Sequence, residues 1–433
     1  MYKNLILILI LPVLFISISV ASEIYDNAIK LYVAPYGNDS WSGKYPEVTD
    51  NDGPFATLNR AKEELHKIKA KNEINTNIII YVREGTYELN APFTLGPEDS
   101  GTAEYPVIFC AYKEEKPVLT SCQEITGFKP YKEKIIECNL KDTQFANILF
   151  KQLFFFGKRQ IIARYPNIDK RDPHEGVWTY IASLEYGNMG KIKDHFRCTN
   201  DVIKDWTNVE QAEVCIHPGS DWAWDIIPIK SVNQSKSEIY LSRNSLYDFK
   251  LADRYYVQNL FEELDSPGEW YLDYNNAILY FWPPSDISKN HIYAPLSDSI
   301  ISINGGKNVI IKGFILDGCV KDSIIMENCK NCVIAKNTIR NCGNRGIKIT
   351  TGKNCGASGN DIYETGGGGI YVEGGDKKTL DKGSNFATNN YIHHIASLHK
   401  EYKNMAITCE GVGNLIDHNL IHDTPYSAIA ISG

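Results

Sequence analysis

A short phrase, Asn-x-Ile, recurs through the last third of the chain and constrains its fold more than any other feature. It begins at Asn337, Asn360, Asn390 and Asn419, and a degenerate copy occupies residues 313–315. The spacing is roughly 23 to 30 residues, which is the period of a solenoid and not of a compact domain. Each phrase is followed by a turn and a second short apolar strand. Short strands with Gly or Asn at the corners and no helical periodicity are typical of one coil of a parallel β-helix.

A single coil cannot bury its own inward face, so successive coils must stack and share one continuous core. We expect the four repeated asparagines to form an internal ladder that hydrogen-bonds backbone groups. The sequence therefore predicts an all-β fold with β-helix coils over residues 295–433. The printed sequence stops at Gly433 in mid-coil, and we expect further coils to follow it because solenoids need a capping unit.

Composition narrows the class of protein. The chain has 433 residues and 43% hydrophobic content, enough for a large core and more than one structural unit. Its net charge of −8 provides no basic stripe, so nucleic acid is not an expected partner. The 26 tyrosines and 7 tryptophans suit a sugar-binding surface and equally suit a large exported β-protein. The odd count of 11 cysteines favours buried thiols over a disulfide framework.

Residues 1–22 have the pattern of a secretory signal. Lys3 supplies the positive end, an apolar run follows over residues 5–20, and Ser19 and Ala21 fit a cleavage site. A permanent membrane anchor is the alternative, but the run is short and contains Pro12. We therefore predict a secreted protein, extracellular or periplasmic, with no membrane association after cleavage.

The segments before the repeats differ in character. Residues 23–127 contain apolar strand patterns and a helical stretch from Leu58 to about residue 69, with Thr57 as its N-cap. Such a helix is expected to cover the open end of the first coil. Residues 128–294 lose the repeat, are rich in Trp and Tyr, and contain a strand-turn-strand pattern around Asn275. They predict an inserted β-rich subdomain.

Several motifs resemble a known superfamily. They occupy residues 32–39, 53–58, 85–87 and 99–102, and they resemble the N-terminal cap of secreted right-handed parallel β-helix proteins of the pectate-lyase-like superfamily. Residues 163–167 and 264–273 narrow the resemblance to the β-helix glycoside hydrolases with an inserted β-subdomain, a group with α-L-fucosidase, xylanase and β-xylosidase activities. The resemblance extends from about Leu31 to the end. It implies a right-handed solenoid and a polysaccharide or oligosaccharide substrate.

The candidate catalytic residues are acids at one corner of the coils: Glu373, Asp376 and Glu410. Equivalent positions in adjacent coils lie about 4.8 Å apart, and glycosidase carboxyl pairs lie roughly 5 to 5.5 Å (retaining) or 6.5 to 9.5 Å (inverting) apart. We predict Asp376 and Glu410 as the pair, with Glu373 in reserve. The Gly-Gly-Asp-Lys segment that ends at Lys377 resembles a Gly-Gly-Asp-Arg element of the β-helix glycoside hydrolases. Lys377 keeps the positive charge of that arginine but cannot make its bidentate hydrogen bonds. For any single acid, a solvated turn residue is the alternative.

Candidate sugar-binding residues follow the Asn-x-Ile strands. His394 and His422 are expected at nearly the same place in successive coils, where they would bond sugar hydroxyls, act as acid or base, or form a structural stack. Lys377, Asp417 and Asp423 complete the predicted substrate-binding set. No metal site is expected, because the cysteine pair at 329 and 332 has no second pair at ligand spacing.

These features together predict a secreted glycoside hydrolase that acts on polysaccharides as a monomer. A lyase or epimerase on uronic-acid polymers is one alternative; it needs a base, and basic side chains or Ca²⁺ to neutralise the substrate carboxylate. A non-catalytic carbohydrate-binding β-helix protein is the other. No cofactor is expected, with Ca²⁺ reserved for the lyase alternative.

Overall fold

The computed structural model describes residues 27–71, 75–146, 148–169, 171, 176–184, 192–219, 221–289, 291–400 and 403–432. The signal sequence predicted over residues 1–22 lies outside the described residues. Within these ranges, none of the helices has the length and apolar character needed to cross a bilayer.

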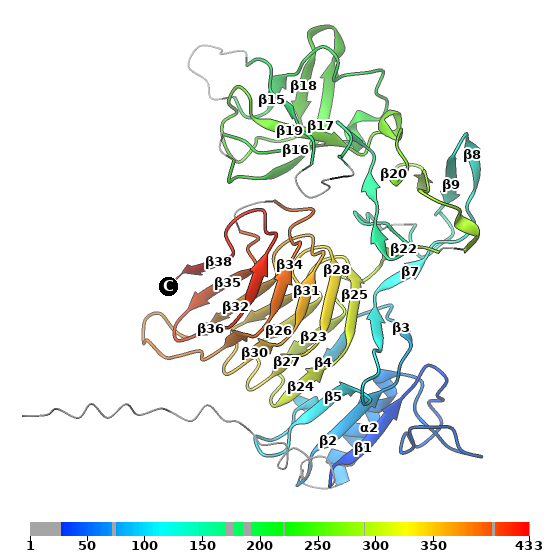
Figure 1. Ribbon diagram of the computed structural model, residues 1–433, viewed down its shortest axis with the longest axis vertical. Helices are drawn as coiled ribbons and strands as arrows, with labels where there is room; N and C mark the ends of the chain where they lie inside the picture. Colours follow the sequence, from blue (N-terminus) through cyan, green and yellow to red (C-terminus); the bar gives the residue numbers. More distant parts are fainter. Residues whose placement is uncertain are drawn as a thin grey trace, which may run out of the picture.

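Three long sheets wind around a common core, and every strand pairing within them is parallel (Figure 1). Sheet A contains β1 (Ile29–Val33), β2 (Ile78–Val82), β5 (Val107–Ala111), β24 (Val309–Lys312), β27 (Val333–Ala335), β30 (Gly356–Ser358), β33 (Phe386–Thr388) and β36 (Leu415–Asp417). Sheet B contains β3 (Thr86–Glu88), β6 (Val118–Thr120), β25 (Ile315–Cys319), β28 (Thr338–Cys342), β31 (Asp361–Tyr363), β34 (Tyr391–His393) and β37 (Leu420–His422). Sheet C contains β4 (Phe93–Leu95), β23 (Ile301–Asn304), β26 (Ile324–Glu327), β29 (Ile347–Thr350), β32 (Ile370–Gly374), β35 (Ile407–Gly411) and β38 (Ile429–Ser432). The chain visits A, B and C in turn, which confirms the predicted parallel β-helix.

The strands from β23 to β35 mostly alternate between a buried and a more exposed residue, because successive side chains of a strand point to opposite faces. In β29, for example, Ile347 and Ile349 are fully buried while Lys348 points outward. The inward residues of all three sheets form one continuous apolar cluster. All eleven cysteines are buried free thiols, as the odd count predicted.

The asparagine ladder is present at the corner between sheets A and B. The backbone N–H of Asn337 donates to Oδ1 of Asn360 (3.1 Å), and that of Asn360 donates to Oδ1 of Asn390 (3.0 Å). Each of these amides also donates from Nδ2 to a backbone carbonyl of the sheet A strand in the preceding coil, as Asn360 does to Ile334 of β27 (3.0 Å). Phe314 occupies the same position in the degenerate first copy, and its N–H donates to Asn337. The repeated asparagines therefore satisfy corner backbone groups that strands cannot reach.

Helix α2 (Leu58–Lys71) lies against β1 at the N-terminal end of the solenoid (Figure 1). Its buried residues Leu58, Ala61 and Leu65 belong to the solenoid core. The hydroxyl of Thr57 accepts the N–H of Arg60 (3.1 Å), which confirms the predicted N-cap. The helix therefore covers apolar side chains at the end of the first coil.

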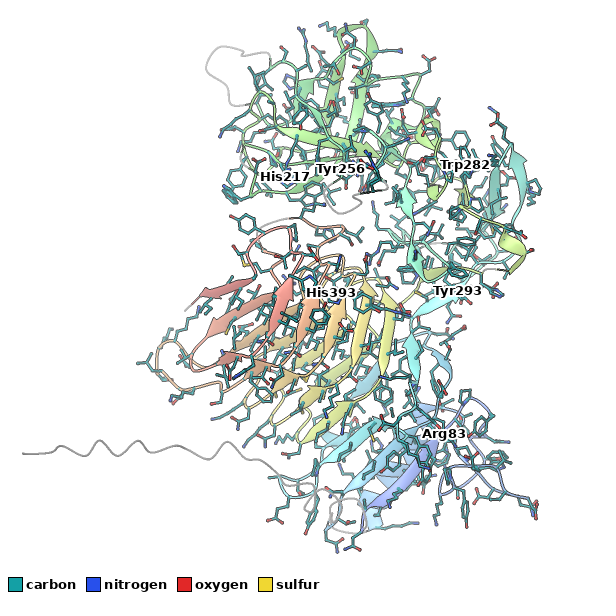
Figure 2. The ribbon with its side chains drawn as sticks, viewed as in Figure 1. Arg83, His217, Tyr256, Trp282, Tyr293 and His393 are labelled. Carbon is teal, nitrogen blue, oxygen red and sulfur yellow. The ribbon has the colours of Figure 1, made fainter. Side chains whose placement is uncertain are left out.

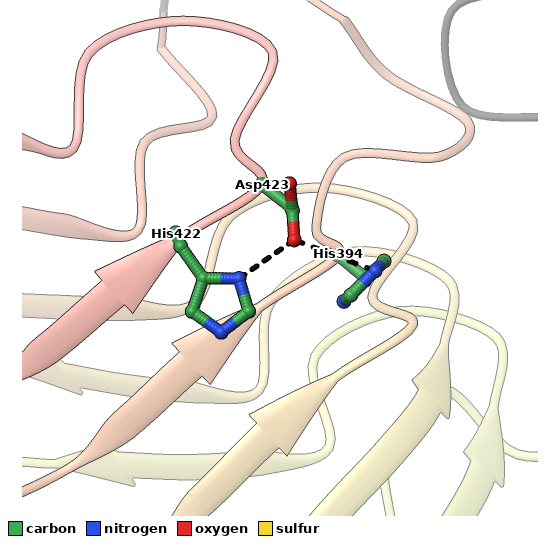
Figure 3. Close-up of side chains that lie close together, drawn as sticks. All are labelled: His394, His422 and Asp423. Carbon is green, nitrogen blue, oxygen red and sulfur yellow. Dashed lines mark hydrogen bonds and ion pairs between the residues drawn. The ribbon is translucent and has the colours of Figure 1, made fainter. Parts of the chain in front are cut away.

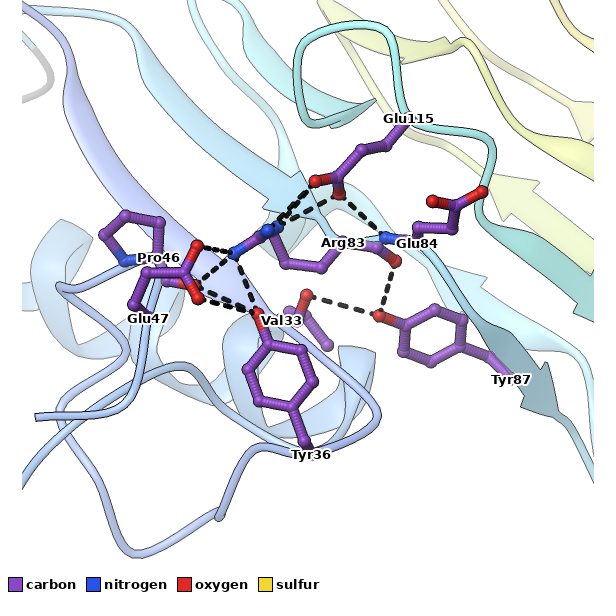
Figure 4. Close-up of polar contacts among 8 residues, drawn as sticks. All are labelled: Val33, Tyr36, Pro46, Glu47, Arg83, Glu84, Tyr87 and Glu115. Carbon is purple, nitrogen blue, oxygen red and sulfur yellow. Dashed lines mark hydrogen bonds and ion pairs between the residues drawn. The ribbon is translucent and has the colours of Figure 1, made fainter.

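Arg83 ties the N-terminal loop to the second coil (Figure 4). Its guanidinium donates to both oxygens of Glu115 (2.9 and 3.0 Å), and its Nη1 donates to the Tyr36 hydroxyl (2.8 Å) and to Glu47 (2.8 Å). The Arg83 side chain is only 13% exposed. A buried guanidinium is stable here because its donors all have oxygen partners.

The insert leaves the solenoid after β6 and returns before β23 (Figure 1). It consists of three mainly antiparallel sheets. Its strands are β7 (Cys122–Glu124), β8 (Lys129–Lys132), β9 (Ile135–Asn139), β10 (Phe154–Phe155), β11 (Lys158–Arg159), β12 (Ile161–Ile162), β13 (Arg164–Tyr165), β14 (Thr179–Tyr180), β15 (His195–Arg197), β16 (Glu213–Ile216), β17 (Asp225–Asn233), β18 (Glu238–Leu241), β19 (Arg254–Gln258), β20 (Glu269–Asp273), β21 (Ile278–Phe281) and β22 (Ile292–Pro295). The strand-turn-strand pattern expected around residue 275 is the β20–β21 hairpin. The predicted domain boundaries at residues 128 and 294 stay a prediction.

In the described ranges there are also five single-turn 3₁₀ helices: η1 (Pro97–Asp99), η2 (Val209–Gln211), η3 (Gln234–Lys236), η4 (Phe261–Glu263) and η5 (Ile287–Lys289). In η1 the Asp99 carboxylate is buried and contacts the ring of His66 on α2 (2.8 Å). This contact joins the capping helix to the edge of sheet C.

Candidate active site on the solenoid face

Two carboxylates lie side by side on the outer face of sheet C. The parallel register of β32 and β35 pairs Glu373 directly with Glu410. Val372 and Cys409, the preceding residues, point into the core, so both acids point outward by the alternation of the strand. Both are half-buried. Adjacent strands in a sheet are about 4.8 Å apart, so the two carboxyl groups are held as close neighbours by the backbone itself.

Tyr371 accompanies this pair on the same face. Its hydroxyl lies 3.4 Å from Oε2 of Glu373. Burial, together with the negative charges of Glu373 and Glu410, raises the pKa of Tyr371 well above its usual value, so the phenol stays neutral and can donate a hydrogen bond. The Arg345 guanidinium lies 5.5 Å from the centre of the Tyr371 ring. The group therefore combines two acids, a neutral hydroxyl donor and a fixed cation.

Asp376 lies beyond the end of β32, in an exposed turn. Its Oδ1 accepts the backbone N–H of Lys378 (2.7 Å), which makes it the first residue of an Asx turn. Within the described part of the chain, no contact joins Asp376 to Glu410. The register brings Glu373, the reserve candidate, opposite Glu410 instead. The catalytic role of Asp376 stays a prediction.

Two other candidates lie apart from this pair. Lys377 is exposed in the same turn as Asp376. Asp417 ends β36 on sheet A, where its carboxylate contacts Nδ1 of the neighbouring His418 (2.7 Å). The carboxylate pair is on sheet C, so Asp417 is on a different face of the solenoid. A substrate-binding role for either residue stays a prediction.

A row of polar side chains runs along the outer face of sheet B, at the third residue of each strand from β25 to β37. The Arg340 guanidinium pairs with Asp317 (2.7 Å) and donates to the Tyr363 hydroxyl (3.2 Å). The Tyr363 ring stacks on His393 at 5.1 Å and 8°, and His393 stacks on His422 at 5.2 Å and 11°. Figure 2 shows His393 on this face, below the insert. Because these rings stack on one another, it is their polar edges that are left to hydrogen-bond a ligand.

The histidine alignment differs from the prediction by one residue. The register of β34 and β37 pairs His422 with His393, not with His394. His394 is the next residue and corresponds to Asp423; both have left-handed backbones, with φ of 49° and 48°. The structure nevertheless brings His394, His422 and Asp423 together: Asp423 Oδ2 lies 2.6 Å from Nδ1 of His422 and 3.5 Å from Nε2 of His394. Burial lowers the pKa of His393, which adjoins them.

A cleft of about 730 Å³ lies between the insert and the corner that joins sheets B and C. Arg164 and Tyr256 line it from the insert, and Arg340 and Tyr363 line it from the solenoid. Figure 2 shows Tyr256 on the underside of the insert, facing the solenoid. Arg340 and Tyr363 of the polar row therefore face this cleft, and clefts of this size are where ligands usually bind.

Arg159 of the insert connects the two sides of the cleft by hydrogen bonds to the solenoid. Its guanidinium donates to the Ser397 hydroxyl (2.6 Å) and to the carbonyls of Glu364 (2.8 Å) and Cys342 (3.2 Å). These are contacts from the insert to three successive corners of the solenoid. A rigid cationic wall of the cleft results.

The sequence analysis did not identify Arg159, Arg340, Tyr363 or Glu364 as site residues. Arg340 and Tyr363 share a position in successive repeats with His393 and His422. Aligning the repeats would therefore have identified them as candidate site residues. Arg159 had no such signal, because its partners are about two hundred residues away in the chain.

Comparisons with known proteins agree with this architecture. The family model for the right handed beta helix region matches residues 276–433. A solved structure named glycoside hydrolase has a TM-score of 0.57 at 15% identity, covering 93% of this chain and 96% of that chain. The structure of XylC with xylose has a TM-score of 0.44 at 15% identity, covering 91% of this chain and 59% of that one.

A lacto-N-biosidase of family GH136 from Eubacterium ramulus has a TM-score of 0.25 at 10% identity, covering 91% of this chain and 56% of that chain. This chain thus spans less than two thirds of the XylC and biosidase chains. No curated protein matches the sequence. The family-model match and the solved structure with a TM-score of 0.57 confirm the predicted right-handed parallel β-helix fold.

Proposed function

We propose that the protein is a glycoside hydrolase that acts on polysaccharides through the carboxylate pair Glu373 and Glu410. The observation that carries the proposal is the register of β32 and β35, which places these two acids on neighbouring strands of one outer face. Glycoside hydrolysis needs one carboxylic acid to protonate the leaving oxygen and one carboxylate as nucleophile or base. A separation of one strand suits the closely spaced pair of a retaining enzyme, roughly 5 to 5.5 Å.

The surroundings of the pair support this chemistry. The Tyr371 hydroxyl lies beside Glu373, so it can donate a hydrogen bond to a carboxylate or to a sugar oxygen. The Arg345 guanidinium lies against the Tyr371 ring, and its positive charge offsets part of the negative charge of two adjacent acids. A protein of the same fold carries the name glycoside hydrolase.

We propose the row on sheet B as the surface that holds the saccharide chain. Tyr363, His393 and His422 offer stacked rings, and the predicted contacts His394 and Asp423 continue that row. Imidazoles and carboxylates bond sugar hydroxyls in either direction. The substrate class that fits is a neutral or mixed polysaccharide or oligosaccharide.

The test is a set of matched substitutions assayed on aryl glycosides, xylan and fucosylated glycans. Glu373→Gln and Glu410→Gln should each lower kcat by about 100-fold or more, since general acid–base groups contribute about that much. Glu327→Gln is the control, because Glu327 has the same position on sheet C as Glu373 but lies two coils earlier. This variant should keep full activity.

The outcome also distinguishes the two versions of the pair. If Asp376→Asn abolishes activity while Glu373→Gln leaves it intact, the pair is Asp376 and Glu410. Full activity in both Glu373→Gln and Glu410→Gln would remove the present assignment. Saccharide binding without turnover by the unmodified protein would identify a non-catalytic carbohydrate-binding protein.

A polysaccharide lyase is the second candidate, favoured by the charge of the cleft. Five of its lining residues are cationic: Lys151, Lys158, Arg159, Arg164 and Arg340. Basic side chains in such a site can neutralise a uronic-acid carboxylate, after which a base removes the neighbouring C5 proton. The test is release of an unsaturated product that absorbs in the ultraviolet from pectin or alginate; none would be formed by a hydrolase.

We also propose that the protein is exported and acts as a monomer. Export rests on the signal pattern of residues 1–22. Recovery from culture supernatant with a mature N-terminus at Ser22 or Glu23 would support it, and retention of the intact N-terminus in the cell would contradict it. Sedimentation of the purified chain measures its state of association.

A further inference from the structure

Three potential metal-binding atoms converge on one point at the corner after β34 and β37 (Figure 3). His394, His422 and Asp423 each offer one ligand atom, and the three atoms lie within 4.8 Å of one another. Asp423 Oδ2 is 2.6 Å from His422 and 3.5 Å from His394. No other group of three such residues occurs in the described ranges.

The backbone explains the convergence. His422 is the last residue of β37, and Asp423 follows it in a left-handed conformation (φ 48°). His394 has the same conformation (φ 49°) in the preceding coil. Left-handed residues turn the chain sharply at the corner. Coil stacking therefore places His394 and Asp423 one above the other, beside the ring of His422.

Hydrogen bonds around the two imidazoles show which nitrogens a cation can reach. Nδ1 of His422 lies 2.6 Å from Oδ2 of Asp423, a hydrogen bond in which Nδ1–H donates because a carboxylate only accepts. A cation that binds here displaces this proton and takes the Nδ1 lone pair, and Nε2–H of His422 then has an acceptor in the Tyr391 hydroxyl at 2.7 Å. Such an outer hydrogen bond is the usual way that a metal-binding histidine is oriented.

The second imidazole is oriented in the same way through His393. Nδ1 of His393 and Nδ1 of His394 lie 2.7 Å apart, so one of them donates to the other. If His394 donates, Nε2–H of His393 points to Oδ1 of Asp361 at 3.3 Å, a buried oxygen that otherwise accepts no hydrogen bond from the described residues. The lone pair on Nε2 of His394 then faces Asp423. Two imidazole lone pairs and a carboxylate oxygen consequently share one point, an arrangement that a cation stabilises.

We propose that His394, His422 and Asp423 bind a divalent cation of the zinc class. Two nitrogen ligands and one oxygen ligand suit Zn²⁺ and its neighbours among transition metals, whereas Ca²⁺ and Mg²⁺ prefer oxygen alone. Side-chain exposures of 35%, 41% and 58% leave the remaining coordination positions open to water or to a ligand. The site lies at the end of the polar row on sheet B and shares no residue with the carboxylate pair on sheet C.

The experiment uses the full chain after treatment with EDTA and dialysis, titrated with ZnCl₂ by isothermal calorimetry. The unmodified protein should bind one Zn²⁺, and His422→Ala, His394→Ala and Asp423→Ala should each weaken that binding by more than about 100-fold, because an outer partner alone contributes about 10- to 100-fold. The control is His418→Ala. His418 and Asp417 form a similar exposed imidazole–carboxylate contact of 2.7 Å with no second histidine, so this variant should bind like the unmodified protein.

Outer-shell variants separate metal binding from simple hydrogen bonding. Tyr391→Phe and Asp361→Asn should weaken Zn²⁺ binding about 10- to 100-fold while leaving the stoichiometry at one. Zn²⁺ should also raise the melting temperature of the unmodified protein and of His418→Ala, and not of His422→Ala. Equal Zn²⁺ affinity in His394→Ala, His422→Ala and the unmodified protein would overturn the proposal, as would the absence of any saturable binding.

Discussion

Replacing Asn360 by Ala tests what holds the solenoid coils in register. The Asn360 amide accepts the backbone N–H and the Nδ2–H of Asn337, both at 3.1 Å. It donates to the carbonyl of Ile334 (3.0 Å) and to Oδ1 of Asn390 (2.9 Å). Asn360 is 1% exposed, so water cannot replace these partners.

The substitution leaves at least two buried backbone groups without this partner, the N–H of Asn337 and the carbonyl of Ile334. Each unsatisfied buried group costs about 1–3 kcal/mol. The expected loss in the free energy of unfolding is therefore about 2–6 kcal/mol. Urea denaturation followed by far-ultraviolet circular dichroism is the appropriate assay, because the signal of the parallel strands is measured directly.

The control is Asn304→Ala. Asn304 is exposed at the end of β23, and its side chain accepts one hydrogen bond, from Asn328 at 3.3 Å. Exposed substitutions of this kind change stability by no more than about 0.5 kcal/mol. If Asn360→Ala loses no more stability than Asn304→Ala, the ladder does not stabilise the coils and the reasoning is refuted.

Three further predictions follow from buried groups. Burial and the charge of Arg254 lower the pKa of His217 to about 4, so between about pH 6.5 and about pH 4 the unfolded chain binds a proton at this residue and the folded chain does not. The free energy of unfolding should therefore fall by about 3 kcal/mol as pH drops from about 6.5 to about 4. In urea titrations at several pH values, His217→Gln should remove this contribution to the pH dependence of stability. Arg83→Lys loses the bidentate hydrogen bonds to Glu115 and should destabilise the chain by about 1–3 kcal/mol, measured as a lower melting temperature. An unchanged melting temperature would show that these hydrogen bonds do not stabilise the fold. The eleven buried cysteines should react with Ellman's reagent only after unfolding, and rapid labelling of the native chain would contradict their burial.

Much of the fold was predictable because its signals are local and repeated. The spacing of the Asn-x-Ile phrases predicted stacked coils, and the ladder from Asn337 to Asn419 forms as expected. Thr57 caps the helix that covers the first coil, as its position before an amphipathic run indicated. These features depend on residues close in sequence or at a constant period, so the chain itself encodes them without reference to distant segments.

Site geometry was less predictable because it depends on register at the level of one residue. Shifting a strand by one residue reverses which face a side chain occupies. The sequence placed Glu373, Asp376 and Glu410 in one region, but only the parallel register showed that Glu373 is opposite Glu410 and that Asp376 begins a turn. His394 was likewise displaced by one position, since it is the left-handed residue that follows β34 and it is His393 that pairs with His422.

The sequence by itself determined the repeat, the corner asparagines and the presence of acids and histidines in successive coils. Tertiary structure alone decided that Arg159 of the insert reaches Ser397 and Glu364 and encloses a cleft, and that His394, His422 and Asp423 share one point. The physical reason is that the first set of features arises from local backbone preferences and burial at a fixed period. The second set arises from contacts whose partners are brought together only when the coils stack and the insert packs on them.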